Sequence, residues 1–264
     1  MKKVGIIGCG NMGSALARGI LKKPSSGFRV GVYDIEKRKV SALAKEFKGL
    51  HKFSSLQALW DASDILIVAV KPQNIEGVLE KIKGPCAKLI ISIAAGITTR
   101  FIEKRVGRAA VIRVMPNLAA RVEKSISALA KGRYANLSHL KIASKIFSCV
   151  GKTLVVNERK IDAVTAVSGS GPGYLFYFLS LIEEAAQKAG LKKKEAEILV
   201  KEMFLGSARV AEEAREDSLS LYLQVASKGG TTEAAVSFWQ KHKLKNLIRK
   251  GINKALKRAK ELSK

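Results

Sequence analysis

The sequence predicts an α/β protein in which a doubly wound sheet is followed by an all-helical part. Short apolar segments alternate with amphipathic ones through the first half of the chain, and a glycine-rich turn follows the first apolar segment. After Ile161 the strand-like segments disappear. With 264 residues, 47% of them hydrophobic, the chain can bury one large core or two smaller ones. We therefore expect two domains, over residues 1–160 and 161–264.

The predicted sheet is built from short segments rich in aliphatic and β-branched residues. They cover residues 3–8, 28–34, 64–70, 88–93, 109–115, 125–130 and 153–156. Most of the gaps between them carry apolar residues at intervals of three and four, which predicts helices. These helices cover residues 11–22, 36–47, 74–82, 98–106 and 137–149. Strands separated by helices indicate parallel pairing, with helices against the sheet.

The first long helix of the second half, which starts near Pro172, is apolar around its whole circumference at residues 174–179. Such a helix must be covered on all sides. A small helical domain can hardly enclose it alone, so we expect a second subunit to supply the missing cover. The chain is therefore predicted to be a homo-oligomer, at least a dimer.

Membrane and metal-binding classes are not expected. The longest apolar stretches, such as residues 65–70, are far shorter than the roughly 20 residues that a bilayer crossing needs. The chain starts almost directly with the first predicted strand, which predicts a cytoplasmic location. Cys9, Cys86 and Cys149 are widely spaced and odd in number, and the histidines show no ligand spacing, so we expect reduced thiols and no metal.

The formal net charge of +26 makes the chain strongly basic, and such a surface attracts polyanions. The basic residues after Lys241 alternate with apolar residues at helical spacing, which indicates the solvated face of a helix. Modules that bind single strands usually interleave aromatic residues among basic ones, and no aromatic residue follows Trp239. We therefore expect no specific nucleic-acid partner and interpret the charge as background surface composition.

The turn Gly8-Cys9-Gly10-Asn11-Met12-Gly13 has the G-x-G-x-x-G spacing of a dinucleotide site. The first glycine permits a tight turn, the second lets a pyrophosphate approach the backbone, and the third packs helix against strand. Because the turn lies between a predicted strand and a predicted helix, it indicates a Rossmann-type domain. The amino end of that helix would bind the pyrophosphate.

The choice between NADPH and NADH stays open at this stage. Asp34 ends the second predicted strand, where a carboxylate can bind the ribose 2′-hydroxyl and disfavour a 2′-phosphate. Lys37, Arg38 and Lys39 follow closely and could neutralise that phosphate.

Loops at the ends of further strands complete the predicted cofactor site. They are rich in small residues or Pro, which let a flat ring approach the backbone closely. Ordinary strand-to-helix turns explain the same pattern equally well. The segments are Ala69-Val70-Lys71-Pro72 and Ile93-Ala94-Ala95, and a similar loop follows the strand that ends before Asn117.

Together with residues 167–172 and 227–232, these segments resemble the pyrroline-5-carboxylate reductase family over nearly the whole chain. The resemblance implies a Rossmann domain and a helical domain that interlocks into a dimer. It also implies NAD(P)H-dependent reduction of the cyclic imine 1-pyrroline-5-carboxylate to L-proline, the last step of proline biosynthesis. A protonated imine is already a good electrophile, so the protein mainly has to orient the two reactants.

The resemblance places Thr232 near the imine nitrogen as a hydrogen-bond partner, and thus as the catalytic residue. The backbone amides of Gly229, Gly230 and Thr231 would bind the substrate carboxylate, because they lie at the amino end of a predicted helix. Ser227 would add a hydroxyl. A plain capping role for Ser227, Thr231 and Thr232 is the alternative.

The sequence departs from the family pattern near the substrate. Lys228 stands where the family usually has Pro, which adds a cation near the expected carboxylate. The resemblance also assigns Asn117 to substrate binding. Leu118 and Ala119 replace the usual Thr-Pro after it, which removes a hydroxyl and a rigid turn and affects this role.

Two alternatives compete with imine reduction by this family. Enzymes like β-hydroxyacid dehydrogenases, or other imine reductases, share the two-domain plan. The dehydrogenases, however, place a catalytic Lys on the first long helix of the second domain, and no Lys occurs at residues 161–187. A non-enzymatic NAD(P)-sensing protein is the second alternative, and the Gly-Gly-Thr-Thr loop argues against it.

Overall fold

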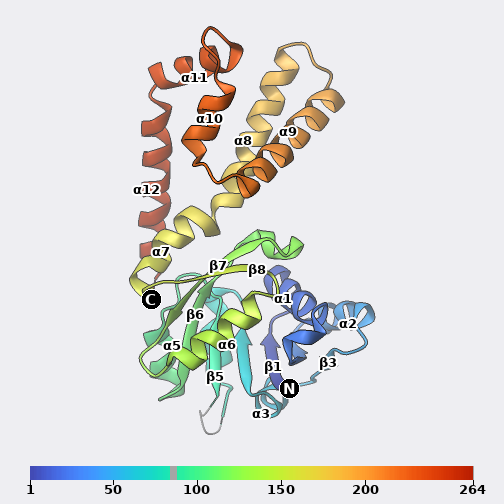
Figure 1. The fold of residues 1–264 in the computed structure, drawn as a ribbon. Helices are drawn as coiled ribbons and strands as arrows, with labels where there is room; N and C mark the ends of the chain where they lie inside the picture. Colours follow the sequence, from blue (N-terminus) through green and yellow to red (C-terminus); the bar gives the residue numbers. More distant parts are fainter. Residues whose placement is uncertain (84–87, 264) are drawn as a thin grey trace. The chain divides into compact units, whose positions relative to one another are not determined.

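The computed structural model describes residues 1–83 and 88–263, which form two compact units (Figure 1). Unit 1 comprises Met1–Pro172 together with Ala255–Lys264, and unit 2 comprises Gly173–Lys254. The boundary between two domains that the sequence predicts after residue 160 stays a prediction. In the structure, residues 161–172 and the end of the last helix belong to the unit that contains the sheet. Cys86 lies outside the described residues.

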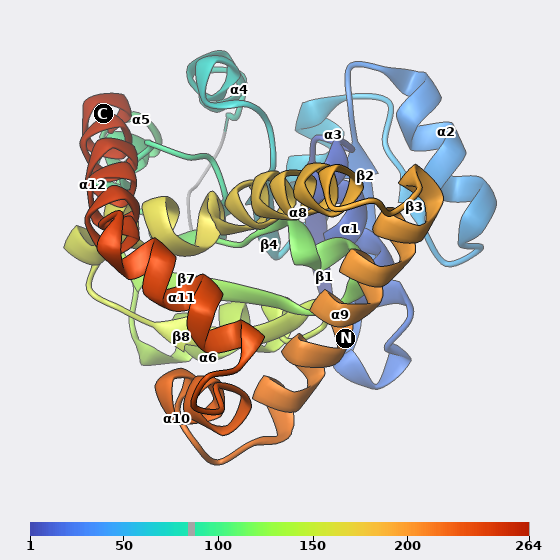
Figure 2. The same cartoon turned by 90° about the horizontal axis from the view of Figure 1, so that it is seen from above.

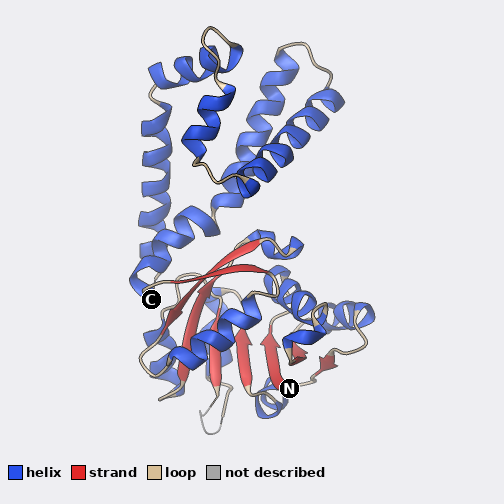
Figure 3. Ribbon diagram, viewed as in Figure 1, coloured by secondary structure: helices blue, strands red, loops and turns tan. Residues whose placement is uncertain are grey.

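Within the described residues, unit 1 holds one eight-stranded sheet in the order β3-β2-β1-β4-β5-β6-β7-β8 (Figure 3). The strands are β1 (Lys2–Ile7), β2 (Phe28–Tyr33), β3 (His51–Lys52), β4 (Ile65–Val68), β5 (Leu89–Ser92), β6 (Ala110–Met115), β7 (Ser125–Lys131) and β8 (Gly151–Val155). Neighbouring strands pair in parallel except β6 and β7, which are antiparallel. The seven predicted strands are present, and the short, exposed β3 was not predicted.

Helices cover both faces of this sheet, because its strands are apolar on both sides. Alternate residues point to opposite faces, so Ile6 of β1 belongs to one buried cluster and Ile7 to the other. The first cluster includes residues of α1 (Asn11–Leu21), α2 (Lys37–Glu46) and α6 (Leu137–Phe147). The second includes residues of α3 (Leu56–Ala62), α4 (Ile75–Leu79) and α5 (Thr99–Val106). In Figure 2, α2 and α5 lie at opposite ends of unit 1.

The remaining segments of unit 1 are short. The 3-10 helices are η1 (Pro24–Ser26), η2 (Pro72–Asn74), η3 (Leu118–Val122) and η4 (Glu158–Lys160). They are followed by α7 (Ile161–Val164) and by a π-helical turn, η5 (Thr165–Gly169), which overlaps the start of the Ser-Gly-Ser-Gly-Pro segment at residues 168–172. π-Helical turns occur frequently at functional sites, which draws attention to this one.

The second half is helical, as predicted. Its helices are α8 (Gly171–Lys188), α9 (Lys193–Glu213), α10 (Ser218–Val225), α11 (Thr231–Lys241) and α12 (Leu244–Leu262). In the single chain α8 buries none of its residues, and Phe176 and Tyr177 are 58% and 64% exposed. Large aromatic side chains in such a row are typical of an interface rather than of a free surface. None of the described helices has the length and apolar composition that spanning a membrane requires.

Candidate active site

The glycine turn between β1 and α1 needs each of its three glycines for a different reason. Gly8 has a φ of +98°, and a Cβ there would lie 2.8 Å from the carbonyl oxygen of Ala69. A Cβ on Gly13 would overlap the carbonyl of Gly8, whose carbon lies 3.1 Å away. A Cβ on Gly10, in contrast, would meet no atom of the described chain within 4 Å beyond its immediate neighbours. The turn is therefore closed at Gly8 and Gly13 and open at Gly10, as a bound pyrophosphate requires.

The amino end of α1 begins at this open side. Gly10 is the N-cap residue, with an extended backbone, and the first turn from Asn11 through Met12 carries no acidic side chain. The Ser14 hydroxyl donates to the carbonyl oxygen of Cys9 over 2.8 Å and holds the turn. The positive end of the helix is thus directed at the turn without a carboxylate to neutralise it.

Asp34, which follows β2, is bonded to the same turn. One carboxylate oxygen accepts from the backbone N–H of Cys9 over 2.6 Å, and the other accepts from the N–H of Glu36 over 2.8 Å. Burial, together with the charge of Asp34, raises the pKa of the Cys9 thiol to about 12. Cys9 is therefore a neutral packing residue, whereas Asp34 is an anion fixed beside the turn.

The basic residues after Asp34 are not all available to a phosphate. Lys39 forms an ion pair with Glu36, and this bond raises the pKa of the Lys39 ammonium group. Lys37 and Arg38 are exposed. The charge balance near Asp34 is therefore less positive than the run of three cations suggests.

The loops that follow β4 and β5 lie beside the glycine turn. The N–H of Gly8 donates to Tyr33 and the N–H of Ala69 donates to Ile7, both over 2.8 Å, because β1 pairs with β2 on one side and β4 on the other. The N–H of Ile93 donates in turn to Val68 over 3.2 Å. The structure thus brings the ends of β2, β1, β4 and β5 to one edge of the sheet, where the strand order reverses. Dinucleotides bind at this position in doubly wound sheets.

The predicted cofactor residues on these loops differ in exposure. Ala94 is buried, Val70, Ile93 and Ala95 are half-buried, and Lys71 and Pro72 are exposed.

Asn117 connects two segments that are far apart in the sequence. Its Nδ2 donates to the Ser168 hydroxyl over 3.3 Å, and its Oδ1 accepts from the N–H of Ala119 over 3.2 Å. Ser168 lies in the π-helical turn η5, whose Gly169 packs beside Met115. Asn117 therefore fixes the turn that precedes α8, a relationship that sequence reasoning missed. Its role in substrate binding stays a prediction.

The predicted substrate loop lies in unit 2, between α10 and α11. Gly230 is the N-cap of α11, and Thr231 and Thr232 begin the helix. Because Gly230 has no side chain, capping of this helix does not require a hydroxyl at the N-cap. Gly229, with a φ of +74°, makes the sharp turn before it.

Two of the three amides expected to bind a carboxylate have partners within the loop or the first turn of α11. The N–H of Gly229 donates to Oε2 of Glu233 over 2.6 Å, and the N–H of Gly230 donates to the carbonyl oxygen of Ser227 over 3.0 Å. Glu233 thus places a carboxylate where a ligand carboxylate is expected. The sequence carried one signal for this contact, because Glu233 lies in the first turn of a predicted helix, where acidic residues are favoured.

The predicted site residues therefore form two groups, one in each unit. The cofactor residues and Asn117 belong to unit 1, and the residues of the 227–232 loop belong to unit 2. Their assigned roles stay predictions.

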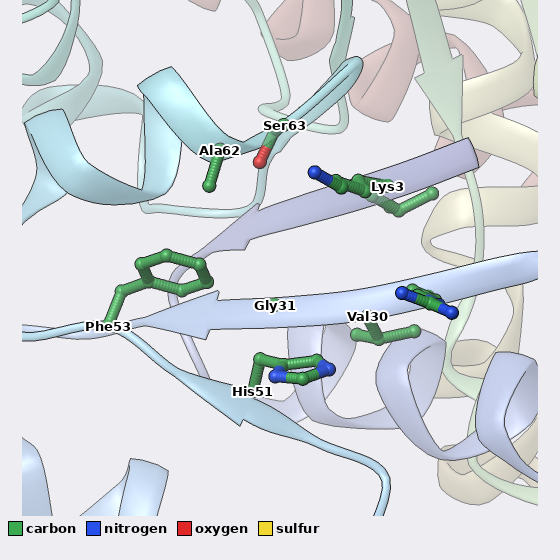
Figure 4. A pocket seen from close by; sticks show the side chains of 9 residues that line it. Lys3, Val30, Gly31, His51, Phe53, Ala62 and Ser63 are labelled. Carbon is green, nitrogen blue, oxygen red and sulfur yellow. The ribbon is translucent and has the colours of Figure 1, made fainter. Parts of the chain in front are cut away.

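A separate cavity of about 280 Å³ lies in unit 1 and contains none of these residues (Figure 4). Gly31 and Phe53 line it together with Lys3, His51 and Ser63. Lys3 and Gly31 lie in the first part of β1 and the middle of β2, away from the strand ends that carry the glycine turn. Ligands of doubly wound sheets bind at the carboxyl ends of the strands, so this cavity is not the candidate active site.

Comparison with known proteins extends these observations to the whole chain. Residues 158–262 match the family model described as pyrroline-5-carboxylate reductase dimerisation, and residues 3–96 match the model described as NADP oxidoreductase coenzyme F420-dependent. The chain is 35% identical to the pyrroline-5-carboxylate reductase of Methanosarcina acetivorans, over 100% of the chain and 98% of the relative. The chain belongs to the pyrroline-5-carboxylate reductase family.

Solved structures of this family have the same fold. The pyrroline-5-carboxylate reductase of Coxiella burnetii is 32% identical, with a TM-score of 0.93 over 100% of this chain and 99% of that one. The Plasmodium falciparum enzyme, solved with NADP bound, is 27% identical, with a TM-score of 0.86 over 100% and 98%. Membership of the pyrroline-5-carboxylate reductase family confirms the predicted fold class and the predicted class of NAD(P)H-dependent oxidoreductases.

Proposed function

We propose that this chain reduces 1-pyrroline-5-carboxylate to L-proline with NADPH or NADH. The observation that carries the proposal is the full-length match to pyrroline-5-carboxylate reductases in a chain that keeps both the glycine turn and the 227–232 loop. A role in the last step of proline biosynthesis follows from that reaction.

The residues of unit 1 fit a dinucleotide. The open backbone at Gly10 and the positive end of α1, which has no side-chain cap, would hold the pyrophosphate, and Asp34 would lie beside the adenosine ribose. The loops at Ala69-Val70-Lys71-Pro72 and Ile93-Ala94-Ala95 would contact the nicotinamide end. The reduced nicotinamide supplies the hydride for the reaction.

The residues of unit 2 would orient the imine. Thr232 is proposed to hydrogen-bond the imine nitrogen through its hydroxyl, and the amide of Thr231 and the hydroxyl of Ser227 to hold the carboxylate. The amides of Gly229 and Gly230 would join them once the ligand carboxylate displaces their internal partners. No strong base is needed, because the imine carbon of a protonated imine accepts the hydride directly.

We further propose that the working form is a homodimer in the cytoplasm. The match of residues 158–262 to a dimerisation model and the exposed aromatic side chains of α8 support the dimer. The free, buried thiols of Cys9 and Cys149 are consistent with a reducing compartment. Light scattering coupled to size-exclusion chromatography tests the dimer, and a monomer at micromolar concentration would contradict it.

The reaction is tested by following NADPH and NADH oxidation with 1-pyrroline-5-carboxylate. Turnover with at least one cofactor, with L-proline as the product, is expected. Turnover with a β-hydroxyacid and NAD(P)⁺ instead would favour a dehydrogenase, and cofactor binding without turnover on either substrate would favour a sensing role.

A further inference from the structure

The last helix of the chain ends against a loop of the predicted cofactor site. Gly96, in the loop between β5 and α5, is buried and has a φ of +73°. A Cβ on Gly96 would overlap the backbone carbonyl of Leu262, whose carbon lies 2.8 Å away. Leu262 is the last residue of α12, and both residues belong to unit 1. The last turn of α12 therefore packs directly on the loop that contains Ile93-Ala94-Ala95.

A partly buried charge cluster around Arg113 bonds the same segment to the sheet. The Ser263 hydroxyl donates to Oδ1 of Asp162 over 2.8 Å, and this oxygen lies 3.3 Å from Nη2 of Arg113. Arg113 points from β6 into the interior and is only 2% exposed. Asp162 pairs with the buried guanidinium of Arg113. Removal of the other partner of Asp162, the Ser263 hydroxyl, would leave this ion pair less restrained.

The opposite side of Arg113 reaches the end of the loop. Its Nη1 lies 3.6 Å from Oε1 of Glu158, and the Glu158 carboxylate accepts from both the N–H and the hydroxyl of Thr99 over 2.7 Å. Thr99 is the first residue of α5, directly after the loop. We call the connected residues Leu262, Ser263, Asp162, Arg113, Glu158 and Thr99 the C-terminal brace.

We propose that the C-terminal brace positions the Ile93-Ala94-Ala95 loop for contact with the nicotinamide end of the cofactor. The proposal rests on the proposed function, and it assigns the brace a positioning role, not a catalytic one. Ala94 and Ala95 carry only methyl groups, and the nearest polar side chain of the loop is that of Ser92, whose hydroxyl accepts from the N–H of Ala94 over 3.3 Å. Its beginning is held by the pairing of Ser92 with Arg113, its middle by Leu262, and its end by Glu158.

The first test removes single contacts from the 264-residue chain. Ser263→Ala is expected to raise the Kd of NADPH and NADH, measured by their fluorescence, by about three- to tenfold, the range of one hydrogen bond. Ser263→Thr keeps the hydroxyl and should bind like the unmodified protein. Lys260→Ala, on the exposed side of the same helix, is the matched control. Equal Kd values for Ser263→Ala and Lys260→Ala would overturn the proposal.

The second test separates positioning from simple packing. Gly96→Ala is compared in the full chain and in a chain that ends at Glu261, with the melting temperature of each. The added methyl overlaps Leu262 only in the full chain, so its effect on the cofactor Kd should be clearly larger there. Equal effects of Gly96→Ala on the cofactor Kd in both chains would overturn the proposed role of the C-terminal brace.

The assays also separate this proposal from the proposed function. Cofactor Kd values are measured without the imine, so a chain that binds cofactor but does not reduce 1-pyrroline-5-carboxylate contradicts the proposed function alone. A brace that acts on the cofactor should change the KM for NAD(P)H more than the KM for the imine. A larger change in the KM for the imine than in the KM for NAD(P)H would overturn the proposed role of the brace.

Discussion

The carboxylate of Asp34 accepts a hydrogen bond from the backbone N–H of Cys9 over 2.6 Å, so the end of β2 is bonded to the glycine turn. A second bond, from the N–H of Glu36 over 2.8 Å, holds the other oxygen of this carboxylate. The chain therefore holds a fixed negative charge where the adenosine ribose is expected.

Replacing this charge should change the cofactor preference. We expect Asp34→Asn to raise the ratio of kcat/KM for NADPH to that for NADH by about tenfold or more. Two like charges about 4 Å apart near a surface repel by roughly 4 kcal/mol, so even a small part of that suffices. Steady-state kinetics with both cofactors measure the ratio, and Asp61→Asn on α3 is the control. A ratio unchanged by Asp34→Asn would mean that Asp34 does not face the 2′ position.

The glycines of the turn should respond differently to an added methyl group. Gly13→Ala forces the methyl onto the carbonyl of Gly8, so we expect a loss of stability of about 1–3 kcal/mol together with lost cofactor binding. Gly10→Ala meets open space, so it should keep the melting temperature but weaken cofactor binding. Thermal unfolding and cofactor titration distinguish the two. Equal melting temperatures for both variants would contradict the packing role of Gly13.

The hydroxyl of Thr232 should affect turnover and not folding. Thr232 is a half-buried residue of the first turn of α11, and its proposed partner is the imine nitrogen. We expect Thr232→Ala to lower kcat by about tenfold, the approximate effect of one lost hydrogen bond, while the circular dichroism spectrum is unchanged. Thr232→Ser should recover most of the activity. Unchanged turnover in Thr232→Ala would remove the proposed role.

Glu233 should compete with the substrate carboxylate for the N–H of Gly229. Removing its charge with Glu233→Gln is expected to lower the KM for 1-pyrroline-5-carboxylate by about threefold, because a charged hydrogen bond within the loop no longer has to be displaced. The KM for the cofactor should stay the same and serves as the internal control. A raised imine KM would show instead that Glu233 holds the loop in its binding conformation.

The buried Cys9 thiol should make stability depend on pH at the alkaline end. Its pKa is raised from 9.0 to about 12 by burial and by Asp34, so the native state favours the neutral thiol. This contribution is complete below pH 9 and is lost as the pH rises from 9 to 12, because the unfolded chain ionises first. Urea unfolding at several pH values should show a steeper alkaline loss for the unmodified protein than for Cys9→Ala. Parallel pH dependences of stability in the two proteins would contradict this contribution of the Cys9 thiol.

Local patterns predicted most of unit 1, because its strands and helices are specified by their own apolar spacing. The elements that were missed include β3 and α3. β3 has only two residues, both exposed, so no apolar pattern marks it. α3 had a readable signal, since the Ser55 hydroxyl caps it by accepting from the N–H of Ala58.

The candidate site was predicted as a set of segments, not as a set of contacts. The bonds from Asn117 to Ser168, from Thr99 to Glu158 and from Ser263 to Asp162 join residues far apart in the chain. Residues so distant in sequence meet only through the folded sheet, and periodicity carries no information about such pairs. Glu233 was missed for a different reason, because an acid near a helix start usually serves only the helix.

The contacts of Leu262 and Ser263 with the rest of unit 1 also determine the order in which the folded molecule is completed during synthesis. The ribosome synthesises the eight strands long before these two residues, so a nascent chain can pair its sheet while this loop is still uncovered. The site is then finished only once α12 has left the ribosome. A truncation before Leu262 therefore removes this last step.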